Sequence, residues 1–129
     1  MMTVRVLVVD DQAPFRRAAR AVLSAAAEFQ LVGEATSGEE AVMLVDSLRP
    51  DVVLMDITMA GIGGIHAARS IKATHPETMT VLVSTYRAND LPLDARVCGA
   101  AAYLHKSDFD GHVLHELWKE RRRYTPSAR

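Results

Sequence analysis

The sequence lacks several features that would point to common protein classes. It has a single cysteine, Cys98, in 129 residues, which excludes an internal disulfide framework and the paired-cysteine motifs of zinc ribbons and redox proteins. It also lacks an excess of charge of one sign, because fifteen basic and sixteen acidic residues give a net charge of −1. This balance removes the general electrostatic argument for direct binding of nucleic acid or a membrane surface.

Long apolar stretches are absent as well. No run approaches the roughly 18 residues of a membrane span, and the first run stops before Asp10 and Asp11, unlike the apolar core of a signal peptide. Hydrophobic residues nevertheless make up 49% of the chain, which is enough for one buried core at this length. We therefore expect a soluble, cytoplasmic, single-domain protein.

Five short apolar runs rich in β-branched residues predict five strands. The first and third are apolar at nearly every position, which is typical of parallel strands covered on both faces. The second and fifth are weaker and fit edge strands. The runs cover residues 4–9, 31–35, 52–55, 81–83 and 101–104.

A segment with helical spacing follows each predicted strand. Pro14 suits the first turn of one helix, and Ser37 with Glu40 forms a capping box that opens the next. The segment over residues 87–99 is the least regular, since it contains Asn89, Asp90 and Pro92, and we expect a short or mobile fourth helix there. Five strand–helix units in series predict an α/β fold, a doubly wound five-stranded parallel sheet with five helices.

Polar residues end four of the predicted strands. Ligands of such sheets bind beyond the carboxyl ends of the strands, so six of these side chains should meet at one edge: Asp10, Asp11, Asp56, Ser84, Thr85 and Lys106. His105 also lies at a strand end, but neighbouring strand residues point to opposite faces, so it and Lys106 cannot both point to one site. Clustered carboxylates repel one another unless a cation lies among them, and hard oxygen ligands select Mg²⁺ or Mn²⁺. An aspartate at a strand end can also simply cap the next helix. That explanation suits Asp11 but not Asp56, which Gly61, Gly63 and Gly64 separate from the next helix.

Other functional motifs are weak. The glycines of residues 61–64 follow neither the dinucleotide-binding nor the P-loop order. No Ser–His–Asp set is convincing. His112 and His115 lack a third metal ligand.

Four segments together resemble the receiver domain of two-component response regulators. They are VLVVDD (6–11), DVVLMDITM (51–59), VLVSTY (81–86) and GAAAYLHK (99–106). The third segment and the residues around Lys106 are most similar to receivers that precede a helix-turn-helix output domain. The resemblance implies a flavodoxin-like sheet of order 2-1-3-4-5, with the receiver over residues 1–123 and a C-terminal tail over 124–129.

The resemblance also implies roles for individual residues. Asp56 would accept a phosphoryl group from a sensor histidine kinase or a phosphotransfer protein. Magnesium, or manganese in its place, would be held by Asp10, Asp11, Asp56 and the backbone carbonyl of Thr58. Lys106 and Ser84 would contact the phosphoryl oxygens, Tyr103 would swing inward in the active state, and Thr58 and Tyr86 would tune the dephosphorylation rate.

The signal would leave through the face formed by the fourth helix, the fifth strand and the fifth helix. Its partner there would be a downstream protein, an output domain in transcription regulation, or a second copy of the chain. The protein would be no enzyme beyond its own phosphorylation and dephosphorylation. The charged end over residues 121–129 favours a natural single-domain protein over a fragment of a longer regulator.

Three residues depart from the family pattern: Ala60 replaces a proline, Gly63 an acidic or polar residue, and Ser107 a proline or aspartate. Two alternatives stay open. One is a phosphorylation-independent scaffold with a receiver fold. The other is a phosphatase that works through a phosphoaspartate, although such enzymes need a second aspartate where Thr58 stands.

Overall fold

The computed structural model describes residues 3–59, 61–86 and 91–121. It contains a parallel five-stranded sheet of order β2-β1-β3-β4-β5, as predicted. The strands are β1 (Val4–Val9), β2 (Phe29–Ala35), β3 (Val52–Asp56), β4 (Met79–Ser84) and β5 (Ala102–His105). The two weaker apolar runs form the edge strands β2 and β5, and β1, β3 and β4 are central.

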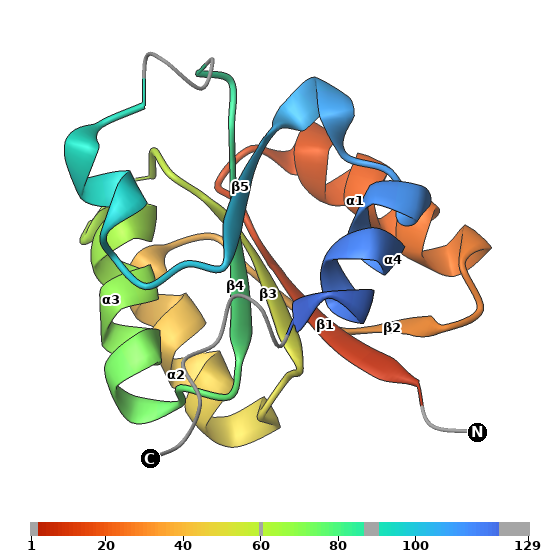
Figure 1. The fold of residues 1–129 in the computed structure, drawn as a ribbon, viewed down its shortest axis with the longest axis horizontal. Coiled ribbons are helices and arrows are strands. Elements are labelled where there is room, and N and C mark those ends of the chain that lie inside the picture. The colour runs from red at the N-terminus through yellow and green to blue at the C-terminus, as the bar shows by residue number, and fades with distance from the viewer. Residues whose placement is uncertain (1–2, 60, 87–90, 122–129) are drawn as a thin grey trace.

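Helices cover both faces of the sheet (Figure 1). One face carries α1 (Ala13–Ala25) and α4 (Gly111–Lys119), and the other carries α2 (Gly38–Leu48) and α3 (Gly63–Thr74). Each face has its own apolar cluster, with Val6, Val8 and Leu54 on the α1 side and Leu7, Val9 and Met55 on the α2 side. Neighbouring residues of a strand point to opposite faces, so strands that are apolar throughout are buried on both.

Helices α1 and α2 start where the sequence predicts. Pro14 lies in the first turn of α1. Ser37 is the N-cap of α2, where its hydroxyl accepts a hydrogen bond from the Glu40 backbone N–H at 3.1 Å. The helix ends at Arg49, which has a left-handed backbone conformation with φ of 50°. These ends fix where β2 and β3 leave and enter the sheet.

The prediction of five helices is wrong for the part of the chain that the structure describes, which contains four α-helices. Between β4 and β5 it contains a 3₁₀ turn, η2 (Leu93–Arg96), in place of a fourth α-helix. Pro92 precedes this turn, and of its neighbourhood only Ala95 and Cys98 are fully buried. Two small buried residues give too narrow an apolar stripe to stabilise a longer helix. Asn89 and Asp90 lie outside the described residues.

The predicted fifth helix is α4, which follows a second 3₁₀ turn, η3 (Lys106–Asp108). Asp110 caps α4 by accepting a hydrogen bond from the Val113 N–H at 2.8 Å. No helix within the described ranges is long and apolar enough to cross a bilayer. The tail predicted over residues 124–129 lies outside the described residues.

Candidate functional site

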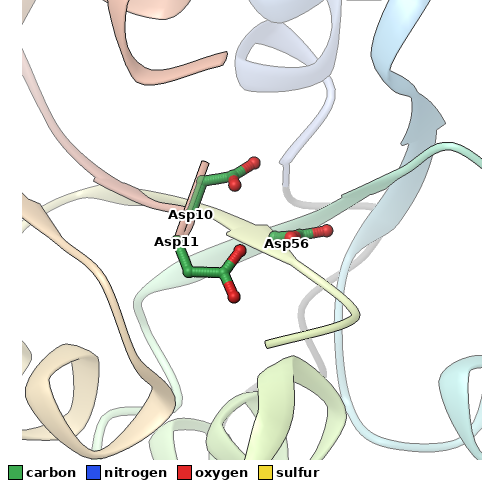
Figure 2. A group of neighbouring side chains, drawn as sticks. All are labelled: Asp10, Asp11 and Asp56. Carbon is green, nitrogen blue, oxygen red and sulfur yellow. The ribbon is translucent and has the colours of Figure 1, made fainter. Parts of the chain in front are cut away.

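Three carboxylates meet beyond the carboxyl ends of β1 and β3. Asp10 follows the last residue of β1, and Asp56 is the last residue of β3. Asp10, Asp11 and Asp56 each offer one oxygen within 4.8 Å of the others. Figure 2 shows the three side chains extending from adjacent backbone segments into the same region. The register that pairs Val9 with Met55 brings these strand ends together.

Asp10 is fully buried, and its groups have different partners. Its Oδ1 accepts a hydrogen bond from the Gln12 N–H at 2.7 Å, and its backbone carbonyl accepts one from Arg16 Nη1 at 2.8 Å. Its Oδ2 has no hydrogen-bond donor within the described residues. The N-cap of α1 is Gln12, so Asp11 does not cap that helix and its exposed carboxylate lies at the mouth of the site.

Asp56 is an acid held in an unfavourable environment for its charge. Burial, followed by the repulsion of Asp10, raises its pKa from 3.8 to about 6, although Lys106 and the Thr58 backbone N–H act in the opposite direction. Since a raised pKa means a destabilised anion, the Asp56 carboxylate has a free-energy reason to accept a cation or to form a covalent bond. It remains largely ionised at neutral pH.

Lys106 supplies the positive charge of the site. Its Nζ lies 2.6 Å from Asp10 Oδ2 and 3.7 Å from Asp56 Oδ2. The ammonium also lies 5.1 Å above the centroid of the Phe15 ring, and Phe15 packs against Phe109 with their centroids 5.8 Å apart. A cation over an aromatic face is attracted to it, so Phe15 and the two carboxylates together fix the end of this long side chain.

The backbone after Asp56 is shaped by glycine. A Cβ at Gly64 would meet the Asp56 carbonyl oxygen at 1.9 Å, so only glycine allows the start of α3 to approach the strand end this closely. The Gly64 N–H donates to the Ile57 carbonyl at 3.0 Å. Glu39 holds the same loop from α2, because its Oε1 accepts from the Ile62 N–H at 3.2 Å. Gly63 has a left-handed backbone conformation with φ of 76°, Thr58 is exposed, and Ala60 lies outside the described residues.

The remaining predicted site residues lie on β4 and β5. Ser84 is buried at the end of β4, and its Oγ accepts a hydrogen bond from the Tyr86 N–H at 2.7 Å. The Tyr86 side chain is 44% exposed. Tyr103 is half-buried and packs against the apolar cluster on the α2 side of the sheet.

The donor set fits a hard divalent cation. Three carboxylate oxygens lie within reach of one centre, one of them is a buried oxygen without a hydrogen bond in the described structure, and carboxylate oxygens are the ligands that Mg²⁺ prefers. The Lys106 ammonium is 2.6 Å from that oxygen, but their contact is an ion pair without hydrogen-bond geometry. The ammonium neutralises part of the negative charge of the site.

Two sets of contacts were missed by the sequence analysis. Arg16 donates to the Asp10 carbonyl and also lies 3.4 Å from Glu34, which Arg20 contacts through two nitrogens. The position of Arg16 in the first turns after Asp11 was a signal for this contact. His105, which the sequence analysis placed only at a strand end, contacts Thr85 and Ser107.

Comparisons with known proteins agree with this geometry. A family model described as "Response regulator receiver domain" matches residues 6–118. The response regulator GacA of Pseudomonas viridiflava is 41% identical over 103 residues, which are 80% of this chain and 48% of that protein. The protein-glutamate methylesterase/protein-glutamine glutaminase 1 of Pseudomonas aeruginosa is 42% identical over 107 residues, which are 82% of this chain and 29% of that protein.

A solved structure gives the same result for the fold. The signal receiver domain of the response regulator NarL from Mycobacterium tuberculosis has a TM-score of 0.85 and 29% identity, over 95% of this chain and 98% of that one. The chain spans about half the length of GacA and less of the methylesterase.

Proposed function

This chain belongs to the response regulator receiver domain family of two-component signalling, and from that premise we propose that it is a magnesium-dependent phosphorylation switch with Asp56 as the phosphoryl acceptor. The observation that carries the proposal is the position of Asp56. It is a buried carboxylate with a pKa raised to about 6, within 4.8 Å of two further acids and 3.7 Å from an ammonium.

In the proposed reaction an Asp56 oxygen attacks the phosphorus atom of a phosphohistidine. The new O–P bond gives an acyl phosphate, the P–N bond breaks, and the leaving imidazole nitrogen takes up a proton. Phosphoryl transfer needs mainly positioning and charge stabilisation from the protein. A magnesium ion held by Asp10, Asp11, Asp56 and the Thr58 carbonyl would supply charge neutralisation at the phosphoryl oxygens.

The chain's own residues would then detect the modification. A phosphoryl group adds about −1.5 to −2 charge and several strong acceptor oxygens. Lys106 is already beside Asp56 and can pair with it, while the Ser84 hydroxyl must exchange its contact with the Tyr86 N–H. Hydrogen bonds to charged groups contribute roughly 1.5–3 kcal/mol each. Two such bonds match the roughly 5.5 kcal/mol that reverses a 1:99 equilibrium.

Tyr103 would follow the movement of Ser84 and carry the change to the surface formed by η2, β5 and α4. Thr58 and Tyr86, both exposed at the mouth of the site, would set the access of water and thus the dephosphorylation rate. The donor would be a sensor histidine kinase or a phosphotransfer protein. The receiver of the signal would be a downstream protein, an output domain or a second copy of the chain.

This proposal makes the domain a signalling module, with self-phosphorylation and dephosphorylation as its only chemistry. The methylesterase relative does not oppose it, because only 29% of that protein is matched. The alternative of a phosphatase has no supporting observation in the site, since exposed Thr58 stands where the second aspartate would be needed.

Intact-mass measurement after incubation with acetyl phosphate and Mg²⁺ tests the proposal. The wild type should gain one phosphoryl group, and Asp56→Asn should gain none. Asp108→Asn, which removes an exposed carboxylate from η3, is the matched control and should behave as the wild type. The wild-type gain should disappear when EDTA removes the metal. A folded wild type that gains no mass would instead support the phosphorylation-independent scaffold.

A further inference from the structure

His105, the last residue of β5, contacts backbone segments at the ends of two strands. Its Nε2 lies 3.0 Å from the Thr85 carbonyl oxygen. Its Nδ1 lies 3.1 Å from the Ser107 backbone nitrogen and 2.7 Å from Ser107 Oγ. A backbone N–H can only donate, so Nδ1 is the acceptor and the ring proton is on Nε2, which donates to Thr85. The contacts therefore select the neutral ring with its proton on Nε2.

One end of this bridge positions the turn that contains Lys106. His105 is the N-cap of η3, and Lys106 is the first residue of that turn. The cap needs the N–H of Ser107, which a proline at this position would not have. The departure from the family pattern at Ser107 and the histidine at 105 thus act as a pair. Together they fix the backbone from which the Lys106 side chain reaches Asp10 and Asp56.

The other end of the bridge holds the segment that contains Ser84. Thr85 lies between Ser84 and Tyr86, and the Tyr86 N–H donates to Ser84 Oγ at 2.7 Å. When the Ser84 hydroxyl turns toward a phosphoryl group on Asp56, this local bond breaks, and the peptide group that joins Thr85 to Tyr86 loses one of the contacts that hold it. The carbonyl of that peptide is the group that His105 holds.

We propose that His105 is a positioning residue that stabilises the resting arrangement of the β4 end, through its bond to the Thr85 carbonyl, and sets the direction of Lys106, through its cap of η3. The proposal rests on the phosphorylation switch proposed above. It predicts that the cross-strand bond opposes activation. Loss of that bond alone should make the active arrangement easier to reach.

Two substitutions separate the contacts of the ring. Asparagine is a good N-cap, so His105→Asn keeps an acceptor for the Ser107 N–H but is too short to reach Thr85. His105→Gln places an amide N–H near the position of Nε2 and should retain the bond to Thr85. His112→Asn, which changes an exposed histidine on α4, is the matched control.

The test is the affinity of each variant for beryllofluoride, a phosphoryl analogue, in the presence of Mg²⁺, followed by backbone amide NMR signals. Because one hydrogen bond contributes a net free energy of order RT, His105→Asn should bind about two- to tenfold more tightly than the wild type. His105→Gln, which retains the Thr85 bond but loses the cap of η3, should not gain affinity, and His112→Asn should stay near the wild type. The ¹⁵N signals of the wild-type His105 ring, recorded without beryllofluoride, should show the proton on Nε2.

Unchanged or weaker binding by His105→Asn would overturn the proposal, and so would a ring proton on Nδ1. If His105→Asn fails to fold, His105→Gln provides the test. The glutamine variant retains the Thr85 bond, so a gain in affinity like that expected for the asparagine variant would contradict the role of that bond. A wild type that binds no beryllofluoride and gains no mass from acetyl phosphate would refute the switch itself. A failure of the switch is thus distinguishable from a failure of the His105 assignment.

Discussion

Replacement of Asp56 by asparagine should make the metal-free protein more stable at neutral pH. The pKa of Asp56 is raised from 3.8 to about 6 in the folded state, so the folded protein binds its proton more tightly than the unfolded chain does. Between these two pH values the folded state carries more protons, and the free energy of unfolding therefore falls as pH rises. The difference of about two pKa units corresponds to about 3 kcal/mol. This penalty is absent below pH 3.8 and complete above pH 6.

The neutral amide of Asp56→Asn carries no such penalty. Urea unfolding without divalent ions should thus show the variant exceeding the wild type by up to about 3 kcal/mol at pH 7.5, with the difference shrinking toward pH 4. Addition of Mg²⁺ at 1,000 times its dissociation constant should reverse the order, since a ligand at that excess adds about 4.1 kcal/mol to the wild type. Asp108→Asn is the control for loss of an exposed carboxylate. A variant that is less stable than the wild type at every pH would refute the argument.

Further predictions follow from the other contacts of the site. Lys106→Ala should bind Mg²⁺ at least as tightly as the wild type in calorimetry, because the ammonium competes for the same carboxylates, yet it should lose the beryllofluoride-induced NMR changes; weaker metal binding would contradict this. Arg16→Ala should lower Mg²⁺ affinity several-fold, because Arg16 donates to the Asp10 carbonyl at the strand end. Arg20→Ala removes only an ion pair with Glu34 and should leave the Mg²⁺ affinity unchanged. Equal losses in the two variants would assign both to general stability. Gly64→Ala should unfold at a lower temperature and lose phosphorylation by acetyl phosphate, because its Cβ would meet the Asp56 carbonyl oxygen at 1.9 Å. Gly111→Ala, whose Cβ would meet its nearest atom at 3.7 Å, should keep the unfolding temperature and the phosphorylation of the wild type. A Gly64→Ala protein with normal stability and phosphorylation would show that the loop can shift freely.

Apolar periodicity was sufficient to predict the five parallel strands and most of the helices, while the strand order came from the family resemblance. The strands with continuous apolar runs proved to be the central ones, and the weaker runs proved to be the edges. The pattern predicts strands well because a strand that is buried on both faces needs an apolar residue at nearly every position. The prediction of a fourth helix was wrong because the residues around η2 bury too few side chains to form an apolar stripe.

The strand-end residues that the sequence nominated also lie where the parallel topology would place them. What the sequence could not supply were contacts between segments that are distant in the chain. Nothing in the residues around Phe15 indicates that a lysine 91 positions later lies over its ring. The bonds of His105 were also hidden, because they depend on how far β4 and β5 extend.

The ion pairs of Lys106 have a consequence for the order in which the chain folds. Asp10 and Asp56 come together as soon as β1 pairs with β3, but their ammonium partner follows β5, 96 residues after Asp10. A nascent chain that ended after β4 would bury two carboxylates with no nearby cation from its own sequence. Such a partial fold is penalised by charge repulsion in a poorly solvated place. Addition of the last strand brings Lys106 beside both carboxylates and lowers this penalty, so the acidic site favours folding of the complete domain over that of truncated chains.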